Sequence, residues 1–137
     1  MSVRPERLFF YGVLIGDLAS PAIRQLLSGL GPGVRASTTG TLLAVPDPRG
    51  AYPVLVPGEG TVHGMLHEAG SVDLVALDAF EGIEYRRQPV TVALANGGSG
   101  MADAYVYQFA PRPEFLPIAH GDFARWLRET GTAPLAG

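Results

Sequence analysis

The stretch Leu77-Asp78-Ala79-Phe80-Glu81-Gly82-Ile83-Glu84-Tyr85-Arg86-Arg87 combines the end of a helix, a glycine and the start of a strand. Before it, apolar residues recur at helical spacing, and the sequence predicts a short helix from Val72 to Phe80. Gly82 is expected to end this helix, because glycine adopts left-handed backbone conformations at little cost. The buried face of the helix is expected to consist of Leu74, Leu77 and Phe80.

Glu81 falls at the very end of this predicted helix, where a negative charge is unfavourable. The C-terminal end of a helix is the negative end of its dipole, and Asp78 lies one turn earlier on the same face. Both effects raise the pKa of Glu81, which suits a carboxylate that exchanges protons near neutral pH. On these residues alone, an ordinary solvated helix end is the favoured interpretation.

The segment after the glycine predicts a β-hairpin. Residues 88–95 alternate between apolar and polar side chains, and residues 101–109 return after a glycine-rich loop. Arg86 and Arg87 stand at the start of the first strand. Because side chains alternate along a strand, only one of these two guanidinium groups can face inward.

The N-terminal part predicts a buried strand, a loop and a helix. Leu8 to Tyr11 is a compact β-prone run. The following loop, from Gly12 to Gly16, has a glycine at each end, and its successive N–H groups can converge on an anion. A helix is expected from Pro21 to about Gly29, with Ser20 as its N-cap.

The middle of the chain predicts three further strands, over residues 34–45, 52–56 and 61–67. Gly40 marks a possible bulge in the first of them. Residues 46–50 and 57–60 have the composition of tight turns, so the strands that they join should pair antiparallel. A last helix is expected to begin at Gly121-Asp122, with a buried stripe made of Phe123, Trp126 and Leu127.

These elements predict an α+β fold. The expected architecture is a small mixed, mostly antiparallel β-barrel flanked by about three short helices, because long βαβ alternation is absent. The length of 137 residues favours one domain that covers the whole chain. Residues 131–137 are expected to be a frayed tail.

Composition excludes several classes of protein. The chain is 47% hydrophobic and 17% charged, enough for a core, and its net charge of -3 without a basic run argues against a nucleic-acid partner. It contains no cysteine, which excludes a thiol nucleophile and thiolate metal ligands. No run approaches ~20 apolar residues, and no signal peptide is evident. A cytoplasmic protein without a membrane partner is therefore expected.

Two common kinds of site do not fit the residues. His63 and His67 lie four apart on a predicted strand, which separates them by about 13 Å and prevents them from sharing a metal ion. Gly98-Ser99-Gly100 lies in a hairpin loop and does not match the nucleophile elbow of serine hydrolases. We therefore expect neither a metal nor a serine nucleophile.

The chain resembles the gamma-glutamylcyclotransferase-like family over nearly its whole length. Seven motifs carry this resemblance in the family's order, although none of them is strong alone. They are Phe10-Tyr11-Gly12-Val13-Leu14, Tyr52-Pro53, Val62-x-Gly64-x-Leu66, Leu77-Asp78-x-x-Glu81-Gly82, Tyr85-Arg86-Arg87, Ala102-x-x-Tyr105 and Ile118-x-x-Gly121-Asp122-Phe123.

The resemblance implies a reaction and a set of site residues. The family cyclises a γ-glutamyl group to 5-oxoproline and releases a free amine or amino acid, without a metal or other cofactor. Glu81 would be the general acid and base, and Asp78 a structural residue that faces backbone or solvent. Tyr105, unlike Tyr107 on the same strand face, would face the substrate. The resemblance places the rest of the substrate site at Tyr11, Gly12, Val13 and Leu14.

Departures from the family pattern leave a second function open. Val13 stands where the family usually has a small hydroxyl residue, and Ile15 where a polar or basic residue is frequent. Retention of Glu81 favours the cyclotransferase, whereas Val13 gives weight to a non-catalytic ligand-binding or interaction domain on the same scaffold. The leaving amine, the oligomeric state and the pathway stay open.

Overall fold

The computed structural model describes residues 5–12 and 21–134. The strands and helices that it contains are β1 (Arg7–Phe10), α1 (Pro21–Leu26), β2 (Gly33–Asp47), β3 (Gly50–Glu68), α2 (Leu74–Glu81), β4 (Tyr85–Leu94), β5 (Ser99–Tyr107), β6 (Leu116–Pro117) and α3 (Phe123–Thr130).

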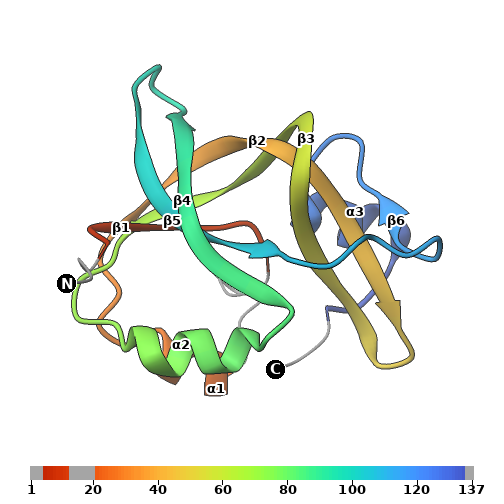
Figure 1. The fold of residues 1–137 in the computed structure, drawn as a ribbon, viewed down its shortest axis with the longest axis horizontal. Helices are drawn as coiled ribbons and strands as arrows, with labels where there is room; N and C mark the ends of the chain where they lie inside the picture. The colour runs from red at the N-terminus through yellow and green to blue at the C-terminus, as the bar shows by residue number, and fades with distance from the viewer. Residues whose placement is uncertain (1–4, 13–20, 135–137) are drawn as a thin grey trace.

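The strands form a closed, mixed β-barrel (Figure 1). They follow the order β3-β1-β5-β4-β2-β6, and an additional pairing of β3 with β2 closes the ring. The pairing of β1 with β5 is parallel, whereas the other pairings are antiparallel. The predicted α+β fold, a mostly antiparallel barrel flanked by three short helices, is confirmed.

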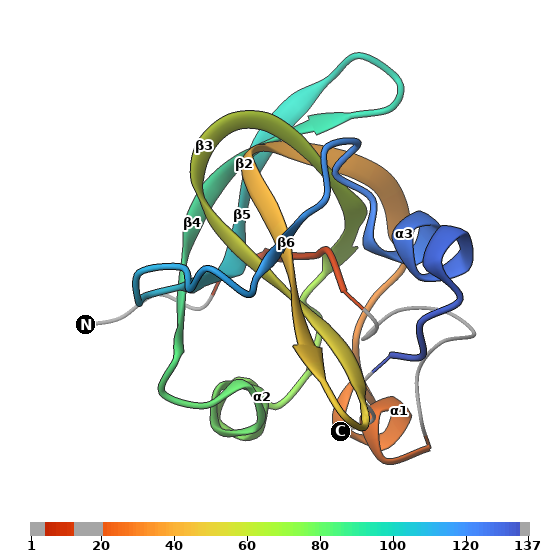
Figure 2. The same cartoon turned by 90° about the vertical axis from the view of Figure 1, so that its right-hand side faces the viewer.

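The helices cover different parts of the barrel. Both α1 and α2 lie at one end, whereas α3 packs against its flank (Figure 2). A cluster of apolar side chains joins α1 and α2 to β1 and β5, and this cluster positions the end of α2. Its buried members are Leu8, Phe10, Ile23, Ala69, Val72, Leu77 and Tyr105.

The prediction of a turn at residues 57–60 is wrong. The strand β3 runs without a break from Gly50 to Glu68. Thr39 of β2 pairs with Thr61, but Thr41 pairs with Val56, so residues 57–60 together lie opposite Gly40. The proline and glycines therefore form a wide bulge, which bends a long strand around the barrel instead of reversing its direction. The bulge expected at Gly40 is confirmed.

Helices α1 and α2 differ from expectation in their bounds and in their buried faces. Helix α1 ends at Leu26 rather than near Gly29, and α2 begins only at Leu74. Leu77 is completely buried, but Phe80 is 41% exposed. The inward face of α2 is thus centred on Leu77, and the side chain one turn later on that face belongs to Glu81.

The chain after α3 is attached to the barrel, although a frayed tail was expected from residue 131 onward. The N–H of Ala51 donates to the carbonyl oxygen of Ala133 at 2.9 Å, and Pro134 forms a parallel bridge with Ala51. Residues 135–137 lie outside the described part of the chain. In the described ranges, no helix is both long enough and apolar enough to cross a membrane.

Candidate active site

Local interactions at both ends of α2 set the position of Glu81. The side chain of Asp73 caps the first turn by accepting a hydrogen bond from the N–H of Ala76, at 3.1 Å. At the other end, Gly82 has a φ of 85° and its N–H donates to the carbonyl oxygen of Asp78. This backbone conformation favours glycine. Glu81 is therefore held as the last residue of the helix, as the sequence predicts.

The carboxyl group of Glu81 is partly buried among three tyrosines. Burial, and secondarily the negative charge of Asp78, raises the pKa of Glu81 to about 7. The charge of Glu81 in turn raises the pKa values of the Tyr11, Tyr85 and Tyr105 hydroxyls, for which burial is the largest cause. The direction expected from the sequence is found, but tertiary burial contributes more than the neighbouring carboxylate.

Asp78 is 44% exposed, in line with the expected orientation toward solvent, but its carboxylate also binds two side chains. Its carboxylate accepts hydrogen bonds from Arg87 Nε at 2.9 Å, Arg87 Nη2 at 3.3 Å and the hydroxyl of Tyr105 at 2.5 Å. Burial alone would raise the pKa of Asp78, but the hydrogen bonds from Arg87 and Tyr105 outweigh it and lower that pKa. Asp78 therefore remains charged at neutral pH beside a carboxyl group, Glu81, that titrates there.

Arg87 connects α2 to the neighbouring strands. Its Nη1 donates to Asp103 at 2.7 Å, and 22% of its side chain is exposed. Arg86 is exposed, so the alternation predicted for this pair is confirmed. The Tyr85-Arg86-Arg87 motif indicates this region, but only the fold shows that Arg87 binds Asp78.

Two tyrosine hydroxyls connect strands close to Glu81. The Tyr11 hydroxyl donates to the carbonyl oxygen of Tyr105 at 2.5 Å and accepts from the N–H of Leu55 at 3.3 Å. The Tyr85 hydroxyl donates to the carbonyl oxygen of Pro53 at 2.9 Å. Strand periodicity gives no reason to select Tyr85, so sequence reasoning did not include it among the site residues.

The other predicted site residues have different outcomes. The Tyr105 hydroxyl donates to Asp78, and the charge of Glu81 contributes to raising its pKa, whereas its predicted contact with the substrate stays a prediction. Tyr107 instead packs edge-to-face against Tyr85, Phe109 and Phe115, and Glu84 is the carboxylate that contributes most to raising its pKa.

Gly12 packs closely against the barrel, and a Cβ atom at this position would lie 2.9 Å from Pro53 Cγ. This close approach explains why glycine suits the position. Val13 and Leu14 lie outside the described residues. The anion-binding role predicted for the N–H groups of this loop therefore stays a prediction.

A cavity of about 860 Å³ opens beside Tyr11 and Gly12. Its other walls come from β2, β3, α3 and the segment that follows α3. Glu81 and Tyr105 are not among the lining residues. Tyr11 thus borders both this cavity and the group of residues around Glu81.

The raised pKa of Glu81 predicts a pH-dependent stability difference. Because the folded-state pKa of about 7 exceeds the ordinary value of 4.5, protonated Glu81 stabilises the fold. This contribution is complete below about pH 4.5 and is lost as the pH rises through 7. The wild type should lose this stability between pH 5 and pH 8, whereas Glu81→Gln should not. In urea unfolding, the unfolding free energy of the variant minus that of the wild type should therefore be about 1 to 3 kcal/mol larger at pH 8 than at pH 5. Glu84→Gln is the control, and an equal gain in that variant would contradict the assignment.

Comparison with known proteins identifies the family. A family model described as gamma-glutamyl cyclotransferase, AIG2-like, matches residues 8–125. The chain therefore belongs to this family, and the predicted resemblance is confirmed.

Relatives and solved structures agree with this assignment. The gamma-glutamylcyclotransferase family protein YtfP of Escherichia coli K12 is 43% identical over 80 residues, which cover 57% of this chain and 63% of YtfP. The chain thus matches less than two thirds of that relative's length. An AIG2-like protein of Mus musculus has a TM-score of 0.68 at 25% identity, covering 88% of this chain and 89% of its own. YkqA of Bacillus subtilis has a TM-score of 0.71 at 25% identity, covering 93% and 43%.

Proposed function

We propose that this protein cyclises a γ-glutamyl amine or γ-glutamyl amino acid to 5-oxoproline and releases the free amine, with Glu81 as general acid and base. Membership of the gamma-glutamyl cyclotransferase family supports a cyclotransferase-like function. The observation that carries the specific chemistry is the partly buried carboxyl group of Glu81, with a pKa of about 7.

The reaction requires one proton to move between two nitrogen atoms. The α-amine of the γ-glutamyl group attacks the γ-carbonyl carbon, forming a C–N bond that closes a five-membered ring. The amide C–N bond then breaks, and the departing nitrogen takes up the proton that the attacking amine has lost. Water is not consumed, and a carboxylate that accepts and then returns one proton is sufficient.

The surroundings of Glu81 suit this role. A group with a pKa near the working pH can accept a proton and return it with little free-energy penalty in either direction. Asp78, held in its charged form by Arg87 and Tyr105, keeps a negative charge next to Glu81. The hydrogen bond from Tyr11 to Tyr105 keeps the adjoining strands in place.

Removing the Tyr105 hydroxyl tests whether its hydrogen bond to the charged Asp78 matters for turnover. Tyr105→Phe removes a hydrogen bond to Asp78, so we expect a loss of about 1 kcal/mol in stability and a several-fold fall in kcat/KM. Tyr107→Phe is the matched control, since its hydroxyl lies by Glu84 rather than Glu81. Chemical unfolding and steady-state kinetics measure both effects. Equal kinetic losses in the two variants would remove Tyr105 from the site.

The proposed function is tested by incubating the protein with a panel of γ-glutamyl amines and γ-glutamyl amino acids and measuring 5-oxoproline. Formation of 5-oxoproline at a rate proportional to enzyme concentration supports the cyclotransferase. The alternative is a non-catalytic ligand-binding or interaction domain on the same scaffold. Saturable binding of panel members without any 5-oxoproline would favour that alternative.

A further inference from the structure

The cavity beside Tyr11 and Gly12 has an apolar wall and a cationic rim. Met65 of β3 and Leu127 of α3 contribute apolar surface. Its volume of about 860 Å³ falls in the range of small-molecule sites. The mixture of apolar wall and charged rim is suited to a small ligand that carries one ionic group.

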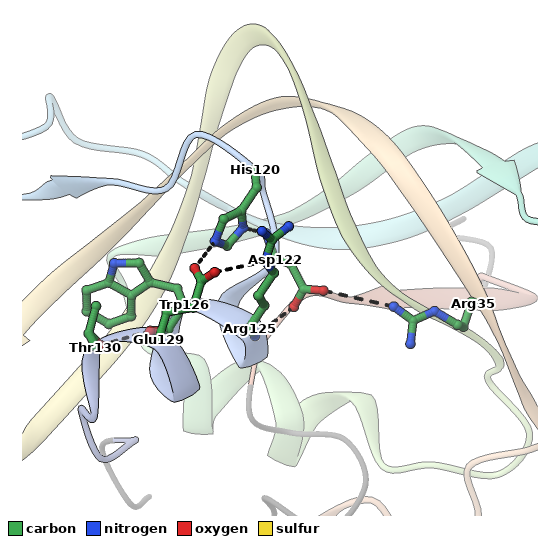
Figure 3. Close-up of polar contacts among 7 residues, drawn as sticks. All are labelled: Arg35, His120, Asp122, Arg125, Trp126, Glu129 and Thr130. Atoms are coloured by element: carbon green, nitrogen blue, oxygen red, sulfur yellow. Dashed lines mark hydrogen bonds and ion pairs between the residues drawn. The ribbon is translucent and has the colours of Figure 1, made fainter.

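The charges at the rim are unbalanced. Among the described residues that line the cavity, Arg35 and Arg128 are basic and Asp122 is the one carboxylate. Asp122 is already engaged, because its Oδ1 accepts a hydrogen bond from the N–H of Arg125 and thereby caps α3. Its Oδ2 lies 3.9 Å from Arg35 Nη2, a long contact to a side chain that is 74% exposed (Figure 3). Within the described residues, no carboxylate lies within 4.0 Å of Arg128.

Arg125, the arginine of α3 that does not line the cavity, has a nearby carboxylate partner. Arg125 Nε lies 3.1 Å from Glu129, and His120 Nε2 lies 2.8 Å from the same carboxylate (Figure 3). Arg35 and Arg128, which border the cavity, thus have no carboxylate partner closer than 3.9 Å among the described residues. A bound anion would supply the partner that they lack.

We infer that this cavity receives the carboxylate of the leaving group, so that the protein prefers γ-glutamyl amino acids and peptides to γ-glutamyl amines without a carboxylate. The inference rests on the proposed function, because Tyr11 links the cavity to the surroundings of Glu81. Arg35 and Arg128 would bind the carboxylate, and the apolar wall would contact the side chain of the leaving amino acid. These two arginines are assigned to specificity and have no part in the proton transfer.

The test compares two ligands that differ in one group, γ-glutamyl-alanine and γ-glutamyl-alaninamide. Calorimetric titration into the Glu81→Gln variant measures binding separately from turnover. We expect roughly 10-fold tighter binding of the acid, a preference typical of a charge-assisted contact. Arg35→Gln and Arg128→Gln should each reduce the preference several-fold. Arg125→Gln, on the same helix but outside the cavity lining, should leave it unchanged.

The possible results separate this inference from the proposed function. Equal binding of the two ligands, no binding of either, or a preference that survives both arginine substitutions would overturn the inference. Failure of the wild-type protein to form 5-oxoproline from either compound would count against the proposed function instead. A further expectation is that the preference for the acid weakens as salt rises, because exposed ionic contacts are screened.

Discussion

Replacing Glu81 with glutamine is expected to reduce 5-oxoproline formation by a factor of roughly 10² to 10⁴, the usual contribution of a positioned acid–base group. Glutamine keeps the shape of the side chain but can neither accept nor return the proton of the attacking amine. The loss should appear mainly in kcat, because the substitution leaves the strands and the Tyr11 hydrogen bonds intact. Steady-state assays on the best substrate of the panel provide the measurement.

Glu84→Gln is the matched control for this experiment. Glu84 lies three residues further along the chain and is exposed, so its replacement should change turnover by less than about twofold. Full activity in the Glu81→Gln variant, on a substrate that the wild-type protein turns over, would end the proposed role.

The wild-type pH profile should agree with the same assignment. Because Glu81 must be deprotonated to act as the base, kcat/KM should fall below an apparent pKa of about 7. Asp78→Asn removes the negative charge beside Glu81, so the apparent pKa below which kcat/KM falls should be lower in that variant. An unchanged apparent pKa in this variant would show that Asp78 does not influence the titrating group.

Replacing Gly64 with alanine is expected to destabilise the protein by about 3 kcal/mol, at the upper end of the cost of overpacking. A Cβ atom at Gly64 would overlap the carbonyl oxygen of Phe10 and lie 2.9 Å from Phe9 Cζ. The Phe10 carbonyl belongs to the backbone of β1, which is paired with β3 on one side and β5 on the other. It therefore cannot move aside as the end of a flexible side chain can.

The Gly64 substitution should also impair turnover, because β1 leads directly into Tyr11 and Gly12. Gly98→Ala is the control, since its nearest neighbours would lie 3.3 Å from the new methyl group in an exposed hairpin loop. Urea unfolding of both variants gives the comparison. A Gly64→Ala protein as stable as the Gly98→Ala protein would show that β1 can shift away from β3.

Some features of the candidate site follow from local sequence. Gly82 places Glu81 at the end of a helix, and strand alternation allows only one of Arg86 and Arg87 to face inward. Glycine-rich connections and β-prone runs likewise predict where several of the strands lie. Each of these properties depends on residues within a few positions of one another, so a linear pattern is sufficient to predict it.

The chemical state of the site was decided by tertiary structure. The pKa of Glu81 rises mainly because the fold buries its carboxyl group, close enough to Tyr11 and Tyr105 for its charge to raise their pKa values. Asp78 stays charged because Arg87, nine residues later on another element, binds it. Desolvation and ion pairing depend on which distant residues meet, and the spacing of residues along the chain does not contain that information.

The turn that was wrongly predicted within β3 has the same cause, because the local sequence does not show which distant strand pairs with it. Residues 57–60 have the composition of a turn, but their partner strand continues past them with Gly40 opposite. The proline and glycines at residues 57–60 determined that the backbone would depart from a regular strand there. Only the pairing with β2, across the closed barrel, decided that the deviation would be a bulge in one long strand rather than a reversal of the chain.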